Sequence, residues 1–191
     1  MRLTDAVLLS SGSPRSRITE SPSDNAPMYY FYDQNDLEED LSGIKLTRKP
    51  KGLFRTNDPV ATVTEGDLVF SLISGKAAIV QPWHDGCLIT QNYAKLFPTS
   101  KVDPAFLAFL LNESDEIRRQ LQTSQQGSVT LKYTIKQLSD LQLPDLPSPK
   151  RQKTIGSLYF SQLKLAALIK RLAESKTTLS LSKLKEATKD E

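Results

Sequence analysis

The polar and apolar positions of residues 149–191 fit one long amphipathic helix. From Ile155 onward, apolar residues recur at alternating steps of three and four, the spacing of the a and d positions of a heptad. Ser148 and Pro149 suit the N-cap and the first helical position. About 38 helical residues reach about 57 Å, farther than a domain of this size. Eight positions form the predicted coiled-coil seam: Ile155, Leu158, Gln162, Leu165, Ile169, Leu172, Lys176 and Leu179.

The same helix has features that suit packing on two sides. Four residues outside the heptad positions widen the apolar stripe: Tyr159, Ala166, Ala173 and Leu184. The helix can therefore contact its own domain near its start and a second helix further along. Gly156, an interior helix breaker that costs about 1 kcal/mol relative to alanine, allows a close helix contact. The alternative is an ordinary amphipathic helix that folds only onto its own domain.

Ahead of this helix, short apolar segments separated by turns predict a curled, mostly antiparallel sheet. The apolar segments are residues 3–9, 28–32, 60–63, 67–72, 77–80, 87–89 and 93–97, with a last extended piece at 141–143. After Asp103, an N-cap before Pro104, the apolar residues recur with the period of a helix. Thr134 is the predicted cap of a second, short helix. The expected loops are residues 15–27, 33–40 and 124–129. We expect an α+β fold, with a domain at 1–148 and the helix at 149–191.

Composition favours a globular protein of a reducing compartment. The chain has 191 residues, enough for one domain with a sizeable core and the helix. Its single cysteine, Cys87, excludes an internal disulfide and a cysteine-based zinc cluster. No apolar run approaches the roughly 18 residues of a membrane span, and residues 6–9 are too few for a secretory signal. We therefore expect a cytoplasmic protein with no membrane partner.

The net charge of +3 divides unevenly along the chain. Residues 149–191 carry +6 and residues 1–148 carry −3, although the domain without its five acids between positions 33 and 40 is at +2. Basic residues recur in the expected loops and turns: Arg15, Arg17, Arg48, Lys49, Lys51, Arg55, Lys76 and Lys132. Phosphate contacts need cations, so the acidic domain weakens a simple claim of nucleic-acid binding. Charge alone does not decide between nucleic-acid binding and a merely solvated surface.

No constellation of catalytic residues stands out. The lone histidine, His84, has no further ligand at metal spacing, so we interpret it as a surface or packing residue. The acids at 33–40 lack a patterned lysine partner and are interpreted as a solvated loop. Residues 71–76 lack the first glycine of a nucleotide-binding loop and the serine or threonine that follows its lysine. Cys87 is interpreted as a small buried residue. These exclusions favour a binding module.

Three motifs carry a resemblance to a known family. They are residues 66–80 (GDLVFSLISGKAAIV), 89–94 (ITQNYA) and 106–111 (FLAFLL), followed by 126–131 (QGSVTL) and a proline-containing passage into the long helix. Together they resemble the target-recognition domain of a type I restriction-modification specificity subunit. The resemblance covers nearly the whole chain, and the order of the motifs is more specific than any one of them. One departure is the glycine turn, compressed to residues 74–76, which puts the DNA contact of that turn in doubt.

The resemblance implies a half subunit. Full specificity subunits have two recognition domains and two antiparallel long helices in one chain, and helix length fixes the gap between the two halves of a bipartite DNA site. This sequence has one of each. A second copy joined through the seam would restore the arrangement, and its twofold symmetry implies a palindromic split site. A different half subunit is the other possible partner.

The resemblance also implies a subunit without catalysis of its own. Such subunits supply sequence recognition to methyltransferase subunits, which use S-adenosylmethionine, and to a restriction subunit that uses ATP. This chain is therefore expected to need no cofactor and no metal. Its target bases are not predictable from the loops.

Double-stranded DNA is the implied ligand, and loop residues are the candidate contacts. Side chains that both donate and accept suit base reading: Ser74, Gln91, Asn92, Gln125 and Gln126. Cationic and hydroxyl side chains suit phosphate positioning: Arg15, Arg17, Lys76, Ser128, Lys132 and Tyr133. For each residue, a solvated loop side chain is the alternative, and Asn92 also suits a turn.

Two other functions stay open from sequence alone. One is an interaction protein that reads no DNA and competes for the methyltransferase, which the −3 charge of residues 1–148 favours. The other is an independent nuclease that uses Asp36 or Glu38.

Overall fold

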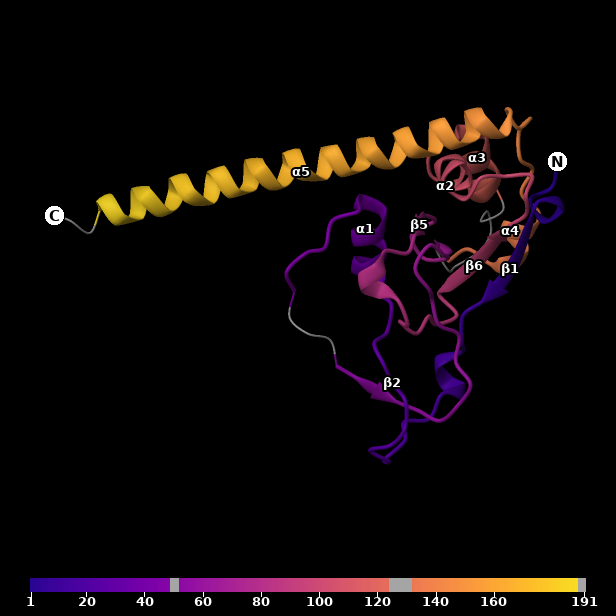
Figure 1. The fold of residues 1–191 in the computed structure, drawn as a ribbon, viewed down its shortest axis with the longest axis horizontal. Helices are drawn as coiled ribbons and strands as arrows, with labels where there is room; N and C mark the ends of the chain where they lie inside the picture. The colour runs from indigo at the N-terminus through magenta and orange to yellow at the C-terminus, as the bar shows by residue number, and fades with distance from the viewer. Residues whose placement is uncertain (49–51, 124–131, 189–191) are drawn as a thin grey trace.

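One long helix, α5 (Pro149–Ala187), runs along one side of the remaining chain and projects well past it (Figure 1). The structure is a computed structural model that describes residues 1–48, 52–123 and 132–188. The predicted helix at residues 149–191 is confirmed over 39 residues, a length of about 58 Å at 1.5 Å per residue. Pro149 stands at its first position, but the Ser148 side chain makes no capping hydrogen bond.

The predicted α+β fold with an antiparallel sheet is confirmed. Four strands have the order β1-β6-β4-β5, and each neighbouring pair is antiparallel. The strands are β1 (Val7–Ser11), β4 (Leu68–Ser71), β5 (Ala77–Ile79) and β6 (Tyr93–Pro98). A separate two-stranded ribbon pairs β2 (Met28–Tyr29) with β3 (Phe54–Arg55).

Two predicted strands, at residues 60–63 and 87–89, are wrong. Each takes part only in isolated bridges, which join Leu88 to Phe31 on one side and to Thr62 on the other. The Leu88 backbone exchanges hydrogen bonds with Tyr30 and Tyr32, and its neighbours bond to Ala61 and Val63, so each pairing is only a few residues long and forms a bridge rather than a strand. The apolar pattern of these segments reflects burial, since Leu88 is fully buried.

The sheet separates two hydrophobic cores. Phe70 on one face packs with residues of three helices, α2 (Pro104–Glu113), α3 (Asp115–Thr123) and α4 (Ile135–Ser139). Val69 on the other face packs with Leu37 of α1 (Gln34–Ser42). Short 3-10 helices complete the domain: η1 (Leu3–Asp5), η2 (Arg15–Arg17) and η3 (Pro82–His84). The alternation of neighbouring side chains explains why β4 is buried on both faces.

The predicted acidic loop at residues 33–40 is wrong, because this segment forms helix α1. Asp33 caps the helix by accepting hydrogen bonds from the amides of Asn35 and Asp36, and Gly43 ends it in a left-handed conformation. The buried face of α1 carries acids that we had expected in solvent. Asp36, Glu39 and Asp40 are each at most 2% exposed.

The first turns of α5 dock on α2. Gln152 is buried there, and its Oε1 accepts from the Asp103 amide at 2.8 Å while its Nε2 donates to the carbonyl of Pro147 at 2.9 Å. The expected close contact at Gly156 is confirmed, because a Cβ there would lie 2.6 Å from the Ala105 Cβ. Asp103 caps α2 as predicted, and Thr134 caps α4.

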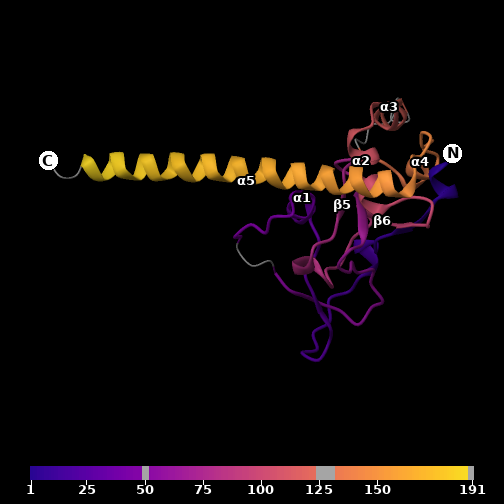
Figure 2. The same cartoon turned by 45° about the horizontal axis from the view of Figure 1, so that its top comes forward.

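Beyond this contact, α5 passes over α1 and then leaves the domain (Figure 2). Residues 167–174 still line a groove with the segment that follows α1. The side chains from position 175 to 188 are all exposed. Among the described residues, no helix is long and apolar enough to cross a membrane.

Candidate nucleic-acid interface

Most of the loop residues predicted to contact DNA lie at one end of the sheet. Because neighbouring strands are antiparallel, β1 and β4 end where β5 and β6 begin. The connections at this end carry candidates from distant parts of the sequence: Arg15, Arg17, Ser74, Lys76, Gln91 and Asn92. We call this region the loop end of the sheet. Lys132 and Tyr133, which follow α3 by nine and ten positions, join it.

Backbone hydrogen bonds hold three chain segments side by side at the loop end. The Leu72 amide donates to the Asn92 carbonyl at 2.8 Å, and the Tyr133 amide donates to the Leu72 carbonyl at 2.8 Å. The turn between β4 and β5 is closed by the Ser71 hydroxyl, which accepts from the Ser74 amide at 3.1 Å. This turn leaves Ser74 exposed at the surface.

Two candidate residues contact each other directly. The Lys132 Nζ donates to the Asn92 Oδ1 at 2.7 Å, and both side chains are half-buried. A lysine predicted to bind phosphate and an asparagine predicted to read bases thus form one unit. Neither sequence spacing nor local pattern indicated this pairing, because 40 positions separate the two residues.

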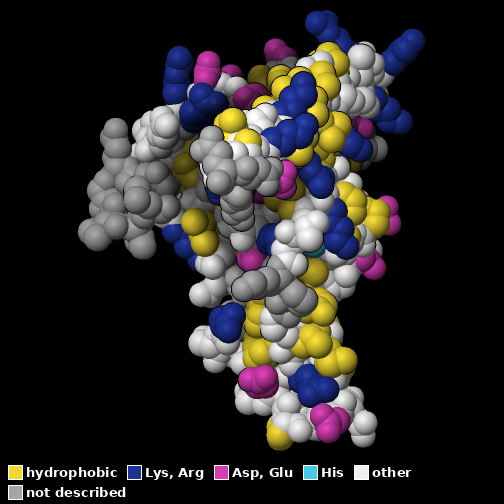
Figure 3. Space-filling view, turned by 90° about the vertical axis from the view of Figure 1, so that its left-hand side faces the viewer, with side chains coloured by type: hydrophobic (Ala, Val, Ile, Leu, Met, Phe, Trp, Pro, Cys, Tyr) yellow, Lys and Arg dark blue, Asp and Glu magenta, His cyan; other side chains and the backbone are white. Residues whose placement is uncertain are grey.

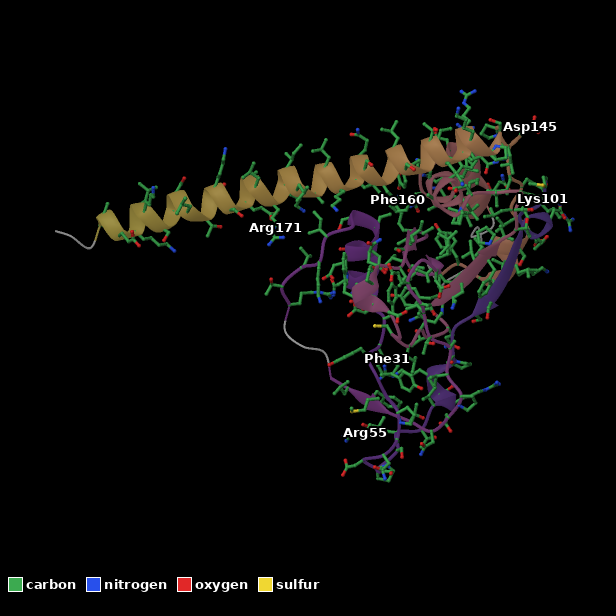
Figure 4. The ribbon with its side chains drawn as sticks, in the orientation of Figure 1. Phe31, Arg55, Lys101, Asp145, Phe160 and Arg171 are labelled. Atoms are coloured by element: carbon green, nitrogen blue, oxygen red, sulfur yellow. The ribbon has the colours of Figure 1, made fainter. Side chains whose placement is uncertain are left out.

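The arginine candidates lie on a segment tied to the same end. The Gln91 amide donates to the Ser13 carbonyl at 3.0 Å, which brings η2 next to the turn before β6. Arg15 and Arg17 of η2 are exposed, and the Arg15 guanidinium carbon lies 4.4 Å from the centre of the Phe31 ring. A cation held over an aromatic face is oriented while it stays accessible. Sequence reasoning missed Phe31, whose position in the domain is shown in Figure 4.

Two other candidates have structural contacts. The Lys76 Nζ donates to the Asn112 carbonyl at the end of α2 at 3.2 Å and lies 3.9 Å from Glu113. The Tyr133 ring packs against Phe70 and lies against Gly75, where a Cβ would be 2.6 Å from the ring. Gly75 has a φ of +68°, so this turn requires a glycine for both conformation and space. A phosphate contact by Lys76 or Tyr133 stays a prediction.

Three candidates lie outside the described residues. These are Gln125, Gln126 and Ser128.

Sequence reasoning also missed a polar group at α1 in which three carboxylates and a histidine are buried and an arginine is partly exposed, which we call the carboxylate cluster. Its members are Asp36, Glu39, Asp40, Arg48 and His84. The Arg48 guanidinium lies 2.7 Å from Asp36 and 2.6 Å from Glu39. The His84 Nδ1 lies 2.7 Å from Asp40 and its Nε2 lies 3.1 Å from Asp36. His84 is a packing residue, as one of the two interpretations had it, but its neighbours are carboxylates.

The carboxylate cluster changes the charge that the domain presents to a ligand. Three of the eighteen acids in residues 1–148 are inside the protein and paired with Arg48 and His84. Burial alone lowers the pKa of the His84 imidazole, but hydrogen bonds and charge from Asp36 and Asp40 outweigh it and raise this pKa to about 9. The surface is therefore less acidic than the formal charge of −3 indicates. Among the described residues, no group of His, Cys, Asp and Glu is arranged to hold a metal ion.

The predicted seam lies on the free face of α5. Leu165 is nine positions from the buried Gly156, about two and a half turns, so the two residues point to opposite sides of the helix. Within the seam, Ile155 packs on the domain core, whereas the other seven positions have more exposure. The exposed apolar members are Leu158, Leu165, Ile169, Leu172 and Leu179. In Figure 3, hydrophobic and cationic side chains lie side by side over the upper part of the molecule.

Comparisons with known proteins give the fold. No family model matches the sequence. No curated protein matches it either. The HsdS subunit of Thermoanaerobacter tengcongensis is similar over 98% of this chain and 42% of its own length, with 19% identity and a TM-score of 0.59. A chain from a type I R-M system, solved to explain complex assembly and conformational transition, is similar over 98% and 43%, with 20% identity and a TM-score of 0.63. This chain therefore has the fold of about two fifths of those chains.

Proposed function

We propose that this chain is a sequence-specific DNA-recognition subunit of a type I restriction-modification system. The observation that carries the proposal is the loop end of the sheet, where donor, acceptor and cationic side chains from four segments meet. The fold shared with an HsdS subunit supports it. Base reading requires several side chains on one rigid platform, and strand ends supply that platform.

The two parts of the chain have separate roles in this proposal. Residues 1–148 form the recognition domain, and residues 149–191 act as dimerisation helix and spacer. The free apolar stripe of α5 supports the second role, since large apolar stripes on isolated helices are covered in stable proteins. A second copy of the chain covers the stripe, which places two recognition domains at opposite ends of a helix pair. The DNA site is then bipartite and palindromic.

The chain is a non-catalytic subunit in this account. It brings methyltransferase subunits, and with them the restriction subunit, to the DNA site. It binds neither S-adenosylmethionine nor ATP itself. The rival function, an interaction protein that reads no DNA, had its main support in the negative charge of the domain. That support weakens because the carboxylate cluster is internal.

A selection experiment tests the proposal. The purified chain, alone and with type I methyltransferase subunits, is incubated with a pool of randomised duplexes, and bound DNA is amplified and sequenced over several rounds. The expected result is one enriched motif with two inverted halves, bound less tightly as salt rises. Absence of any enriched motif in both conditions, at every salt concentration, overturns the proposal. Enrichment of an unrepeated motif would retain DNA recognition and remove the symmetric dimer.

A further inference from the structure

The Lys132–Asn92 pair is held rigidly by its surroundings. Leu72 lies between the two residues and exchanges backbone hydrogen bonds with Asn92 on one side and Tyr133 on the other. The Lys132 side chain therefore reaches across the turn between β4 and β5 to make its 2.7 Å contact. The Tyr133 ring lies against Gly75 and so also contacts the turn between β4 and β5. Leu72 thus ties the backbone of Asn92 and that of Tyr133, the neighbour of Lys132, to the same strand end.

The contact fixes which way the Asn92 amide faces. An ammonium group donates and never accepts, so the atom at 2.7 Å from Lys132 is the amide oxygen. The Nδ2 group then points elsewhere, with two hydrogens to donate. Within the part of the chain that the structure describes, Nδ2 makes no hydrogen bond, and the Lys132 ammonium has no second acceptor. The pair therefore offers hydrogen-bond donors to a ligand.

Only one base edge matches a group of donors. In the major groove, guanine presents two acceptors, O6 and N7, whereas adenine pairs an acceptor with a donor. Thymine presents one acceptor next to a methyl group, and cytosine presents a donor. Resting on the proposed function, we propose that Asn92 and Lys132 together read the O6 and N7 atoms of one guanine. Lys132 has a second role as well, because its contact with Oδ1 positions the Asn92 amide.

This inference moves Lys132 from phosphate binding to base reading. A phosphate is also rich in acceptors, but a lysine that binds phosphate acts as a mobile point charge on a flexible stem. Lys132 instead spends one of its three donors on a neutral amide at short distance. That contact gives nothing to phosphate binding and orients Asn92. The two roles predict different patterns of lost affinity.

The test measures discrimination at each base pair. Binding of the full chain, with methyltransferase, is measured by fluorescence anisotropy on the selected duplex and on every single-pair substitution of it. Asn92→Ala and Lys132→Met are each expected to lose about 10- to 100-fold discrimination at the same G·C pair. The double variant should lose no more than either single variant there. Lys132→Arg, which keeps a donor for Oδ1, should retain most of the discrimination.

One substitution should reverse the preference. Asn92→Asp keeps an oxygen for Lys132 but replaces the amide donors with an acceptor, so preference at this pair should move from guanine toward cytosine. Lys136→Met, which removes an exposed lysine from α4, is the matched control and should leave all discrimination unchanged. Circular dichroism and thermal unfolding of each variant show that the fold persists.

Each of the following outcomes would overturn the inference. Lys132→Met could weaken all duplexes equally, with a salt slope lower by about one, which identifies a phosphate contact. The two single variants could relax different base pairs, or their shared pair could lack guanine. If the unmodified chain itself discriminates no duplex, the proposed function fails, and this inference fails with it. If the unmodified chain discriminates between duplexes and Asn92→Ala discriminates equally well, this inference fails but the proposed function stands.

Discussion

The Nδ1 atom of His84 lies 2.7 Å from the Oδ1 atom of Asp40, inside the protein and under α1. Asp36 and Glu39 face the other ring nitrogen, at 3.1 and 3.5 Å. The Tyr32 hydroxyl donates to the second oxygen of Asp40 at 2.7 Å. Three segments of the chain thus meet at one group of charges, and we expect the stability of the fold to depend on it.

The first prediction concerns pH. The pKa of His84 is raised from 6.5 to about 9 in the folded protein, so protonation of this ring stabilises the fold. The contribution is complete below pH 6.5 and disappears as pH rises to about 9, a loss of about 3 kcal/mol. Urea unfolding between pH 6 and 9.5 measures it. In His84→Gln this part of the pH dependence should vanish, and parallel curves for the two proteins would contradict the assignment.

The second prediction concerns Arg48, the cation of the carboxylate cluster that follows α1. Its loss removes the guanidinium that lies 2.7 Å from Asp36 and 2.6 Å from Glu39, two buried carboxylates. Leaving buried carboxylates without their cation is costly, so Arg48→Met should lower the free energy of unfolding by about 3 kcal/mol. Lys45→Met removes an exposed lysine nearby and should change it by less than about 0.5 kcal/mol. Equal effects of the two substitutions would show that Arg48 is not a structural partner.

The third prediction concerns the docking of α5 on α2. Gly156→Ala places a methyl group 2.7 Å from backbone atoms of Ala105 and Phe106, so α5 must shift. We expect a loss of about 1–3 kcal/mol, although alanine favours the helix itself. Ser182→Ala, on the exposed part of α5, is the control and should be neutral or slightly stabilising. Thermal unfolding followed by circular dichroism checks both, and a stabilised Gly156→Ala protein would refute the close contact.

The fourth prediction concerns the proposed dimer. Ile169→Glu puts a charge in the middle of the exposed stripe of α5 and should shift the protein to monomer. Thr178→Glu adds the same charge nine positions later, about half a turn round the helix, and should leave the mass unchanged. Light scattering at high micromolar concentration, with and without methyltransferase, gives the mass. A monomeric unmodified protein in both conditions would rule out the seam as a dimer interface.

The long helix and most of the sheet were predictable from sequence because each rests on a local period. The heptad spacing after Ile155 and the alternation along residues 67–72 report directly on helix and strand. Helix α1 was missed because its buried face carries Asp36, Glu39 and Asp40, and acids indicate surface unless their partners are known. Their spacing of three and one along the chain was the available helical signal.

The sequence predicted which residues belong to the candidate site, but it did not predict how they contact one another. The loops that carry Ser74, Asn92 and Lys132 were predicted, and antiparallel pairing brings them to one end of the sheet. The contact between Lys132 and Asn92 depends on the placement of residue 133 beside Leu72, which no local pattern encodes. The structural role of Lys76 at the end of α2 depends in the same way on tertiary packing.

The ratio of affinities for two duplexes tests the central claim most directly. The full chain with methyltransferase is titrated with the selected duplex and with a scrambled duplex of equal length and composition, at several salt concentrations. A recognition subunit should prefer the selected duplex by at least about 1000-fold, with both affinities falling as salt rises. Equal affinities for the two duplexes at every salt concentration would contradict the account.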